Sequence, residues 1–141
     1  MRPQLLRKNG RSEQGSAYME LAILMPVLLF LLFAIIEAGL VAGMDNSLVS
    51  VTDYGIRAMA VNGGMNEEIQ EKIKAQMALR GINPEKSTIE ATWEPVQFNE
   101  EIYLKIQYPY SFSLFGPVSD NLDLHLNLAA DSYAISEKFF R

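Results

Sequence analysis

The feature that most constrains the fold of this chain is an apolar run from Leu21 to Met44, in which Glu37 is the only ionisable side chain. As a helix rising about 1.5 Å per residue, the run reaches roughly 36 Å, more than the ~30 Å hydrocarbon core of a bilayer. It therefore predicts a transmembrane helix. If the uninterrupted part before Glu37 fills the hydrocarbon, the Glu37 carboxylate lies near the far interface and reaches water.

A second acid, Glu20, stands directly before this run and five residues after Gly15. A carboxylate in hydrocarbon costs several kcal/mol, so Glu20 needs a compensating group. Cleavage between Gly15 and Ser16 would provide one, because the new α-amino group of Ser16 is a cation one helical turn from Glu20. The N-terminal N–H groups and the helix dipole also favour an anion there. A pair with the terminal amine of a neighbouring chain would set the axial register of packed helices.

Charge is distributed unevenly along the chain. The first fifteen residues carry Arg2, Arg7, Lys8 and Arg11 against Glu13, whereas the whole chain has a net charge of −5. A basic head before an apolar run predicts a cytoplasmic N-terminus. The acidic remainder argues against nucleic-acid binding, which requires a Lys/Arg surface. The absence of cysteine excludes disulfides and thiolate sites.

Two helices are predicted in the part of the chain before Pro84, where apolar residues recur at helical spacing. The first continues past Met44 as an amphipathic helix and ends at Asn62-Gly63-Gly64; its apolar positions are Leu48, Val51, Ile56 and Met59. Asn66 is a suitable N-cap for the second, Glu67 and Glu68 suit its first turn, and Gly81 can stop it. The apolar face of this second helix consists of Ile69, Ile73, Met77 and Leu79.

After Pro84 apolar residues alternate with polar ones over 88–94, 101–108 and 122–128. This period of two predicts three strands, each with one wet face. The predicted fold class is α+β, with a long N-terminal hydrophobic helix, a second short helix and a small three-stranded antiparallel sheet covered by the amphipathic helix. The predicted segments are a leader (1–15), a transmembrane and assembly helix (16–62) and an extracytoplasmic α+β domain (66–141).

No constellation in the sequence favours an enzyme. His125, the single histidine, is flanked by Asp123 and Asn127 at strand spacing, but no fourth metal ligand is evident and we favour a solvated strand face. There is no nucleophile elbow and no phosphate loop, and Gly63-Gly64 is better explained as a hinge between helices. The sequence predicts a non-enzymatic protein without a metal or cofactor.

Two further groups of residues have a structural and a functional interpretation. Gly39 and Gly43 form a Gly-x-x-x-Gly step beside Ala34, Ala38 and Ala42, which favours close helix packing in lipid but is a weak signal. Aromatic residues gather around the second predicted strand, where we favour a role in closing the core over a binding surface. They are Tyr103, Tyr108, Tyr110, Phe112 and Phe115.

A short basic leader, a glycine and a glutamate at the fifth position after it resemble type IV prepilins and pseudopilins. More particularly, "GSAYMELAILMPVLLFLLFAIIEAG" resembles the opening of TadE-like proteins of the tight-adherence (Tad/Flp) pilus. The ending "LAADSYAISE" is similar to the end of that family's final strand. The features that match at the opening are Gly15, Glu20, Leu21-Ala22, Pro26, the Leu/Phe run, Glu37 and Gly39.

The resemblance implies a minor pilin or pseudopilin that acts in pilus assembly and adhesion. A prepilin peptidase, an aspartyl protease in the membrane, would cut after Gly15 on the cytoplasmic face. The product would cross the inner membrane once with its C-terminal domain outside, and it could enter an extracellular pilus. Its partners would be other pilin or pseudopilin subunits and the Tad assembly machinery. Pro26 would loosen the helix by removing one backbone hydrogen bond.

Three alternatives remain at this point. The apolar run could be an ordinary signal peptide cut near Val41-Ala42-Gly43, leaving a secreted protein that starts near Met44. The chain could instead be an uncleaved single-pass anchor for an extracytoplasmic binding domain, indifferent to substitution of Glu20. Secretion-system pseudopilins share the architecture of pilus subunits. Ser16 is not the bulky apolar first residue of type IV pilins, so N-methylation is not presumed.

Overall fold

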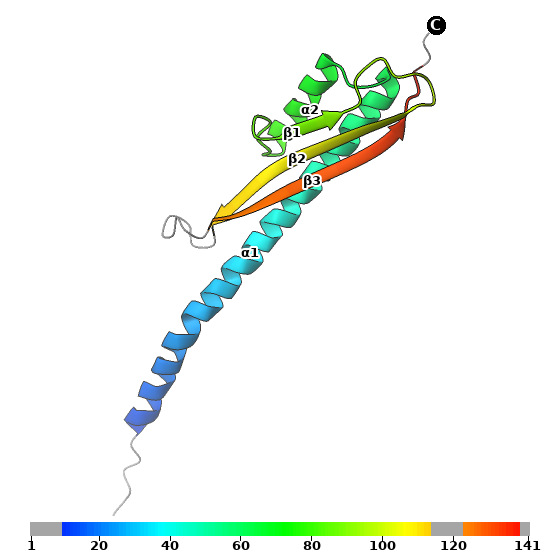
Figure 1. Cartoon of the computed structure of the whole chain (residues 1–141). Coiled ribbons are helices and arrows are strands. Elements are labelled where there is room, and N and C mark those ends of the chain that lie inside the picture. Colours follow the sequence, from blue (N-terminus) through cyan, green and yellow to red (C-terminus); the bar gives the residue numbers. More distant parts are fainter. Residues whose placement is uncertain (1–9, 114–122, 139–141) are drawn as a thin grey trace, which may run out of the picture. The chain divides into compact units, whose positions relative to one another are not determined.

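The computed structural model describes residues 10–113 and 123–138 of the chain. The elements are two helices, α1 (Gly10–Asn62) and α2 (Glu67–Leu79), followed by three strands, β1 (Thr88–Ala91), β2 (Glu101–Ser113) and β3 (Asp123–Ile135) (Figure 1). The predicted α+β fold class is confirmed in element order and in type. Helix α1 begins at Gly10, so the end of the predicted 1–15 leader is helical, while residues 1–9 lie outside the described part.

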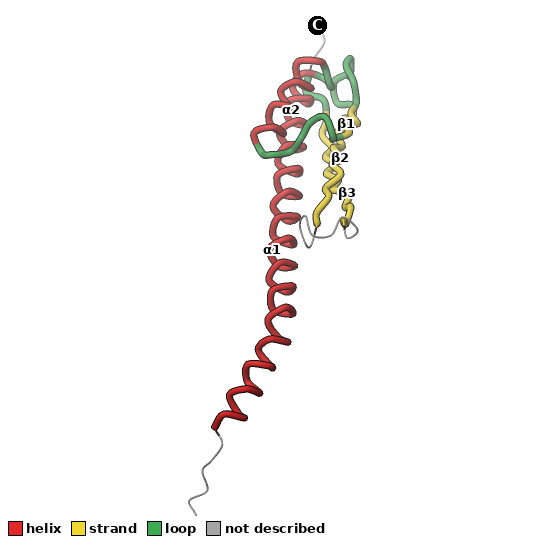
Figure 2. The backbone as a smooth tube through the Cα atoms, turned by 90° about the vertical axis from the view of Figure 1, so that its left-hand side faces the viewer, coloured by secondary structure: helices red, strands yellow, loops and turns green. Residues whose placement is uncertain are grey.

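The contacts within the chain divide it into two compact units, Met1–Ile36 and Glu37–Arg141. In its described part the first unit consists of helix α1 alone. The second unit contains the C-terminal part of α1, together with α2 and the three strands. Within this second unit the helices cover one side of the sheet, as the tube view shows (Figure 2).

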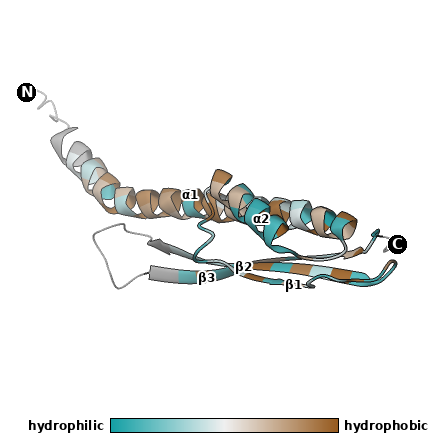
Figure 3. Ribbon diagram, turned by 90° about the horizontal axis from the view of Figure 1, so that it is seen from above, coloured by the Kyte–Doolittle hydropathy of each residue, from teal (hydrophilic) through white to brown (hydrophobic). Residues whose placement is uncertain are grey.

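The sheet has the order β1-β2-β3, and both pairings are antiparallel. Strand β2 is central, so Ile106 pairs with Ile89 on one side and with Ala130 on the other. Buried apolar residues alternate with exposed or half-buried residues along β2. The hydropathy colouring shows hydrophobic and hydrophilic bands along the sheet (Figure 3). The buried face of β2 is the one that contributes to the core. Its buried members are Ile102, Leu104 and Ile106.

Helix α1 contributes one stripe of side chains to the core of the second unit. The four apolar residues predicted for this stripe, Leu48, Val51, Ile56 and Met59, are all buried. Thr52 is buried beside them, and its hydroxyl donates to the Leu48 carbonyl at 2.9 Å, which satisfies this buried polar group. Tertiary packing of this stripe stabilises the C-terminal part of α1 more than helix propensity does.

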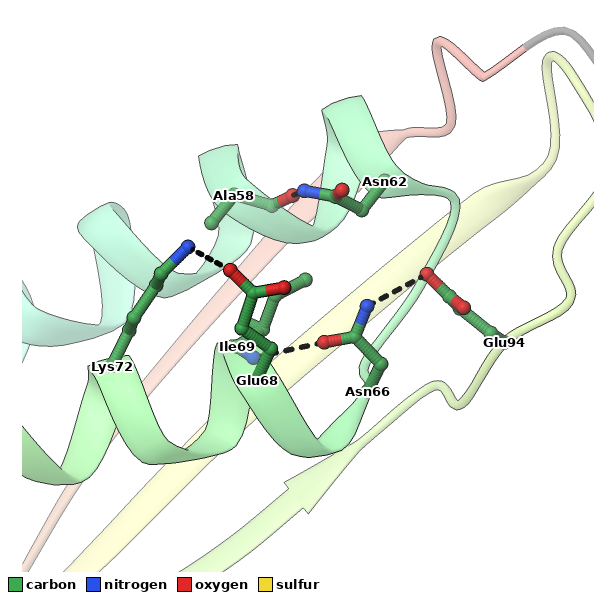
Figure 4. Close-up of polar contacts among 7 residues, drawn as sticks. All are labelled: Ala58, Asn62, Asn66, Glu68, Ile69, Lys72 and Glu94. Atoms are coloured by element: carbon green, nitrogen blue, oxygen red, sulfur yellow. Dashed lines mark hydrogen bonds and ion pairs between the residues drawn. The ribbon is translucent and has the colours of Figure 1, made fainter.

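Helix α2 has the predicted cap and most of the predicted apolar face. The Asn66 side chain accepts from the Ile69 N–H at 2.8 Å and donates to Glu94 Oε1 at 3.1 Å, joining the start of α2 to the segment that follows β1 (Figure 4). Ile69, Ile73 and Met77 are buried. The inclusion of Leu79 was wrong: it is 80% exposed, because the helix ends there and Gly81 turns the chain at φ 75°.

The turn between the helices is fixed in place, which differs from the predicted hinge. Gly63 and Gly64 have φ of 79° and 121° and are buried. A Cβ on Gly64 would lie 2.9 Å from the Glu94 nitrogen, so only glycine fits. The Gly63 carbonyl accepts from the Val96 N–H at 3.0 Å, which holds the turn against the following segment.

All three strands differ in extent from the prediction. Strand β2 runs five residues past Tyr108, to Ser113. Strand β1 ends at Ala91, and Trp93 forms only an isolated parallel bridge with Met65. Strand β3 runs seven residues past the predicted end at Leu128, to Ile135. Periodicity missed this part because its core-facing residues, Ala130 and Ala134 among them, are small; Leu122 lies outside the described residues.

Candidate assembly site on helix α1

The predicted processing site lies on one continuous helix. Gly15, Ser16 and Glu20 are all exposed residues of α1, and Ser16 and Glu20 are one helical turn apart. Nothing in the described chain lies within 4 Å of a Cβ placed on Gly15. The site is therefore open to another molecule.

The Glu20 side chain makes no hydrogen bond or ion pair with any residue that the structure describes. The residues that follow it are large and apolar, and those of the first unit are about half exposed or more, Leu28 at 54% among them. Helix α1 is the one described helix long and apolar enough to cross a membrane, and its most apolar window is not buried by the chain. A carboxylate at the edge of such a surface requires a partner beyond the described side chains if it enters lipid.

Pro26 lies inside α1 without ending it. Proline has no N–H, so the carbonyl one turn earlier, at Ala22, loses its usual helical donor. Prolines are tolerated within transmembrane helices because neighbouring groups can satisfy the freed carbonyl. The structure keeps the helix continuous here, from Gly10 to Asn62.

The predicted packing stripe of small residues is open. No heavy atom lies within 4 Å of a Cβ placed on Gly39 or Gly43. Ala38 and Ala42 are exposed, and Ala34 is half-buried. The described part of the chain thus leaves the face that carries the two glycines free for another helix.

Glu37 is half-buried, and contact of its carboxylate with water at a membrane interface stays a prediction. Its Oε2 atom is buried and has no hydrogen-bond partner among the described residues. Val41 and Met44, four and seven residues later, are also half-buried. Glu37 therefore lies on the same stripe of α1 that continues into the core, which explains why the chain encloses one of its oxygens.

Gly55 is a residue of α1 that the sequence analysis did not single out. It is buried, and a Cβ added to it would lie 2.5 Å from Leu104 Cδ2 and 2.8 Å from Ile73 Cδ1. Its missing side chain lets α1, α2 and β2 meet at one point. The sequence signal for this role was weak, because a lone glycine in a helix has several explanations.

The remaining groups considered in the sequence do not assemble into a site within the described residues. His125 and Asn127 are exposed, and no three potential ligands come together there to hold a metal ion. Tyr108 packs against the core as predicted, whereas Tyr103 lies on the opposite, exposed face of β2. Phe115 and the side chains of Phe112 and Asp123 lie outside the described part.

Helix α2 carries an ion pair between Glu68 and Lys72 on its solvent-exposed face. Lys72 Nζ lies 2.6 Å from Glu68 Oε1 (Figure 4). The hydrogen bond and the charge of Lys72 hold the pKa of Glu68 below its ordinary value, and the same pairing raises the pKa of Lys72. Both side chains are exposed, so this pair is a surface feature of the second unit.

Residues 15–57 match the family model described as TadE-like protein. The resemblance predicted from the sequence is confirmed over this segment, which begins at Gly15 and includes Glu20, Pro26, Glu37 and Gly55. No curated protein and no solved structure matches the chain. The similarity noted for "LAADSYAISE" falls outside the matched segment and stays a prediction.

Proposed function

From its TadE-like segment, consistent with a protein of the Tad pilus system, we propose that this chain is a minor pilin or pseudopilin. A prepilin peptidase cuts it after Gly15, and the mature protein crosses the inner membrane once. Its C-terminal domain is outside, and the protein acts in assembly of the pilus and in adhesion. It has no enzymatic activity of its own, and its partners are other pilin or pseudopilin subunits and the Tad machinery.

The observation that carries this proposal is the position of Glu20. It begins the most apolar part of a helix within the family match, and no described residue of the chain compensates it. Cleavage after Gly15 creates an α-amino group at Ser16, on the same helix one turn away. In a packed bundle that amine, or the amine of a neighbour, pairs with the Glu20 carboxylate and fixes the register of the helices.

The continuity of α1 supports a retained anchor over a removed signal peptide. The helix passes through Val41-Ala42-Gly43 without a break, and Met44 packs against the core. Removal of everything before Met44 would leave the family match without most of its length. The large second unit, with its own sheet and core, supports the role of a minor subunit over that of a major pilin.

The experiment that tests the proposal is N-terminal sequencing of the protein recovered from membranes of its native host. We expect a chain that begins at Ser16. A start near Met44 would identify a secreted protein, and an intact Met1 would identify an uncleaved anchor; either result overturns the proposal.

Gly15→Ala is expected to reduce processing, because the added methyl group lies next to the cleaved bond. The measurement is the shift between precursor and mature bands on a gel. Gly10→Ala, which alters another glycine of the predicted leader, is the matched control and should be processed normally. Normal processing of Gly15→Ala would contradict the assigned cleavage site.

Glu20→Ala is expected to leave cleavage largely intact and to impair assembly, because the register pair is lost while the bond after Gly15 is unchanged. Surface pili are counted by electron microscopy and cleavage is followed on the same samples. Met19→Ala, at an adjacent exposed position, is the control. Unchanged piliation in Glu20→Ala would exclude a role of this carboxylate in register.

A further inference from the structure

The last turns of α1, the loop before β2 and the end of β3 lie together at one end of the second unit (Figure 1). Residues of these three segments line a groove of about 630 Å³. Its volume is within the range of binding pockets. Backbone hydrogen bonds hold its walls together: Asn99 N–H donates to the Ser136 carbonyl at 2.9 Å, and Glu137 N–H donates to the Ala60 carbonyl at 2.8 Å. These bonds connect all three segments that line the groove.

Three large apolar side chains line this groove and remain in contact with solvent. Val61 is 64% exposed, Phe98 48% and Ile135 56%. They come from α1, the loop before β2 and β3, so the fold brings together residues that are far apart in the sequence. Covering these side chains would remove apolar surface from water, which favours association.

The groove also carries one positive and one negative side chain, Arg57 and Glu137. Both are exposed, and neither forms an ion pair or a side-chain hydrogen bond with the described residues. The described ion pairs lie elsewhere, between Lys72 and Glu68 and between Lys138 and Glu94.

This combination of charges limits what fits the groove. An anionic ligand that pairs with Arg57 meets the like charge of Glu137, and a cationic ligand meets Arg57. A surface that carries one charge of each sign is complementary to itself, because a two-fold rotation brings each charge opposite its counterpart. The rotation also places the apolar side chains of one copy against the same side chains of the other.

We propose that this groove is the contact surface for a second copy of the chain, in an isologous pair. Arg57 of each copy meets Glu137 of the other, and Val61, Phe98 and Ile135 form the apolar centre. The pairing uses the second unit alone, so it does not depend on cleavage after Gly15 or on the helix contacts of the first unit. It provides a subunit contact outside the membrane.

The chain has no cysteine, so a single introduced thiol reports on this contact without a background. The full-length Ile135→Cys variant is oxidised in native membranes, and disulfide-linked dimers are counted on a non-reducing gel. Ala129→Cys is the matched control, because Ala129 is an exposed residue on the same face of β3 but does not line the groove. We expect at least a tenfold excess of dimer for Ile135→Cys.

Charge exchange then tests the geometry of the pair. In the Ile135→Cys background, Arg57→Glu alone places acids against acids, and Glu137→Arg alone places bases against bases. Each is expected to reduce the dimer yield at least fivefold. When the two variants are co-expressed with different tags, every contact joins opposite charges again, so the mixed dimer should recover while both homodimers remain low.

The mixed sample separates the proposal from its alternatives. If Arg57 paired only with Glu137 of its own chain, co-expression would restore nothing. If the groove held a different ligand, Ile135→Cys would cross-link no more than Ala129→Cys. Either result overturns the proposal, as does a dimer yield that is indifferent to both charge changes. To show that each variant is folded, its melting curve is followed by Trp93 fluorescence and should match that of the unaltered protein.

Discussion

The two parts of helix α1 share a backbone conformation and differ in everything that surrounds them. In the first unit the apolar side chains of the span are exposed and the chain buries none of its most apolar window. In the second unit one stripe, including Leu48, Val51 and Met59, is completely buried. From Leu21 to Ile36 the first part is apolar on all sides, whereas the second carries polar residues such as Asp53 and Arg57 away from the core.

This difference shows how the distribution of apolar residues around a helix indicates what covers it. A helix that is apolar all round needs an apolar environment on every side, which the described part of the chain does not provide. A helix with a single apolar stripe needs one packed surface, which the sheet provides. The TadE-like match spans both parts, so it includes the exposed apolar segment as well as the core-forming stripe.

The largest expected effect comes from a matched pair of leucines. Leu48→Ala should cost about 2–5 kcal/mol of folding stability, because Leu48 is fully buried and its loss leaves a cavity. Leu28→Ala should leave the stability of the second unit unchanged, because Leu28 lies in the other unit. The single tryptophan, Trp93, lies in the second unit and reports its unfolding by fluorescence in detergent. Equal shifts for the two variants would show that the parts of α1 are not independent.

Two substitutions at glycines of α1 sharpen the comparison, because they show where the helix begins to pack against other elements of the second unit. Gly55→Ala forces a methyl group against Leu104 and Ile73, and such overpacking costs about 1–3 kcal/mol against a gain of about 1 kcal/mol in helix propensity. We expect a net loss of stability. Gly39→Ala meets nothing within 4 Å and should be neutral or slightly stabilising.

The same Trp93 melting assay compares these two variants. A loss of stability in Gly39→Ala would show that other parts of the chain pack against α1 at that residue. A gain in Gly55→Ala would show that Leu104 and Ile73 move aside at little cost.

Sequence patterns predicted those parts of the fold in which one periodicity dominates. The stripe of α1, the Asn66 cap and the alternation in β2 follow from local rules and from the size of the apolar side chains. The end of β3 was missed because Ala130 and Ala134 give no strong hydrophobic signal although they face the core. Gly55 was missed because its role depends on two other elements, α2 and β2, approaching the same point.

The candidate site was predictable in part for a related reason. Gly15 and Glu20 are five residues apart, and their relation is a matter of local helix geometry and charge. The groove near Arg57 and Glu137 is assembled from three distant segments, so no local pattern marks it. The enclosed oxygen of Glu37 likewise depends on tertiary packing that composition does not specify.

The smallest effect on stability is expected for a substitution on the solvent-exposed face of α2. It shows how much an exposed position in the second unit contributes, for comparison with the buried positions of α1. The pKa of Glu68 is lower in the folded than in the unfolded protein, because the carboxylate pairs with Lys72. The pair therefore stabilises the fold at pH values above the unfolded-state pKa of Glu68. This stabilisation is lost as the pH falls through the folded-state pKa. Lys72 has a raised pKa, so its contribution is lost as the pH rises through that value. Exposed pairs of this kind contribute little.

Lys72→Met should therefore lower the Trp93 melting midpoint only slightly at neutral pH, by less than either buried substitution in α1. The difference from the unaltered protein should disappear in acid, where Glu68 is protonated in both proteins. Lys74→Met, which removes an exposed lysine on the same helix, controls for the change in net charge. A drop as large as that of Leu48→Ala would mean that α2 is held by charge rather than by Ile69, Ile73 and Met77.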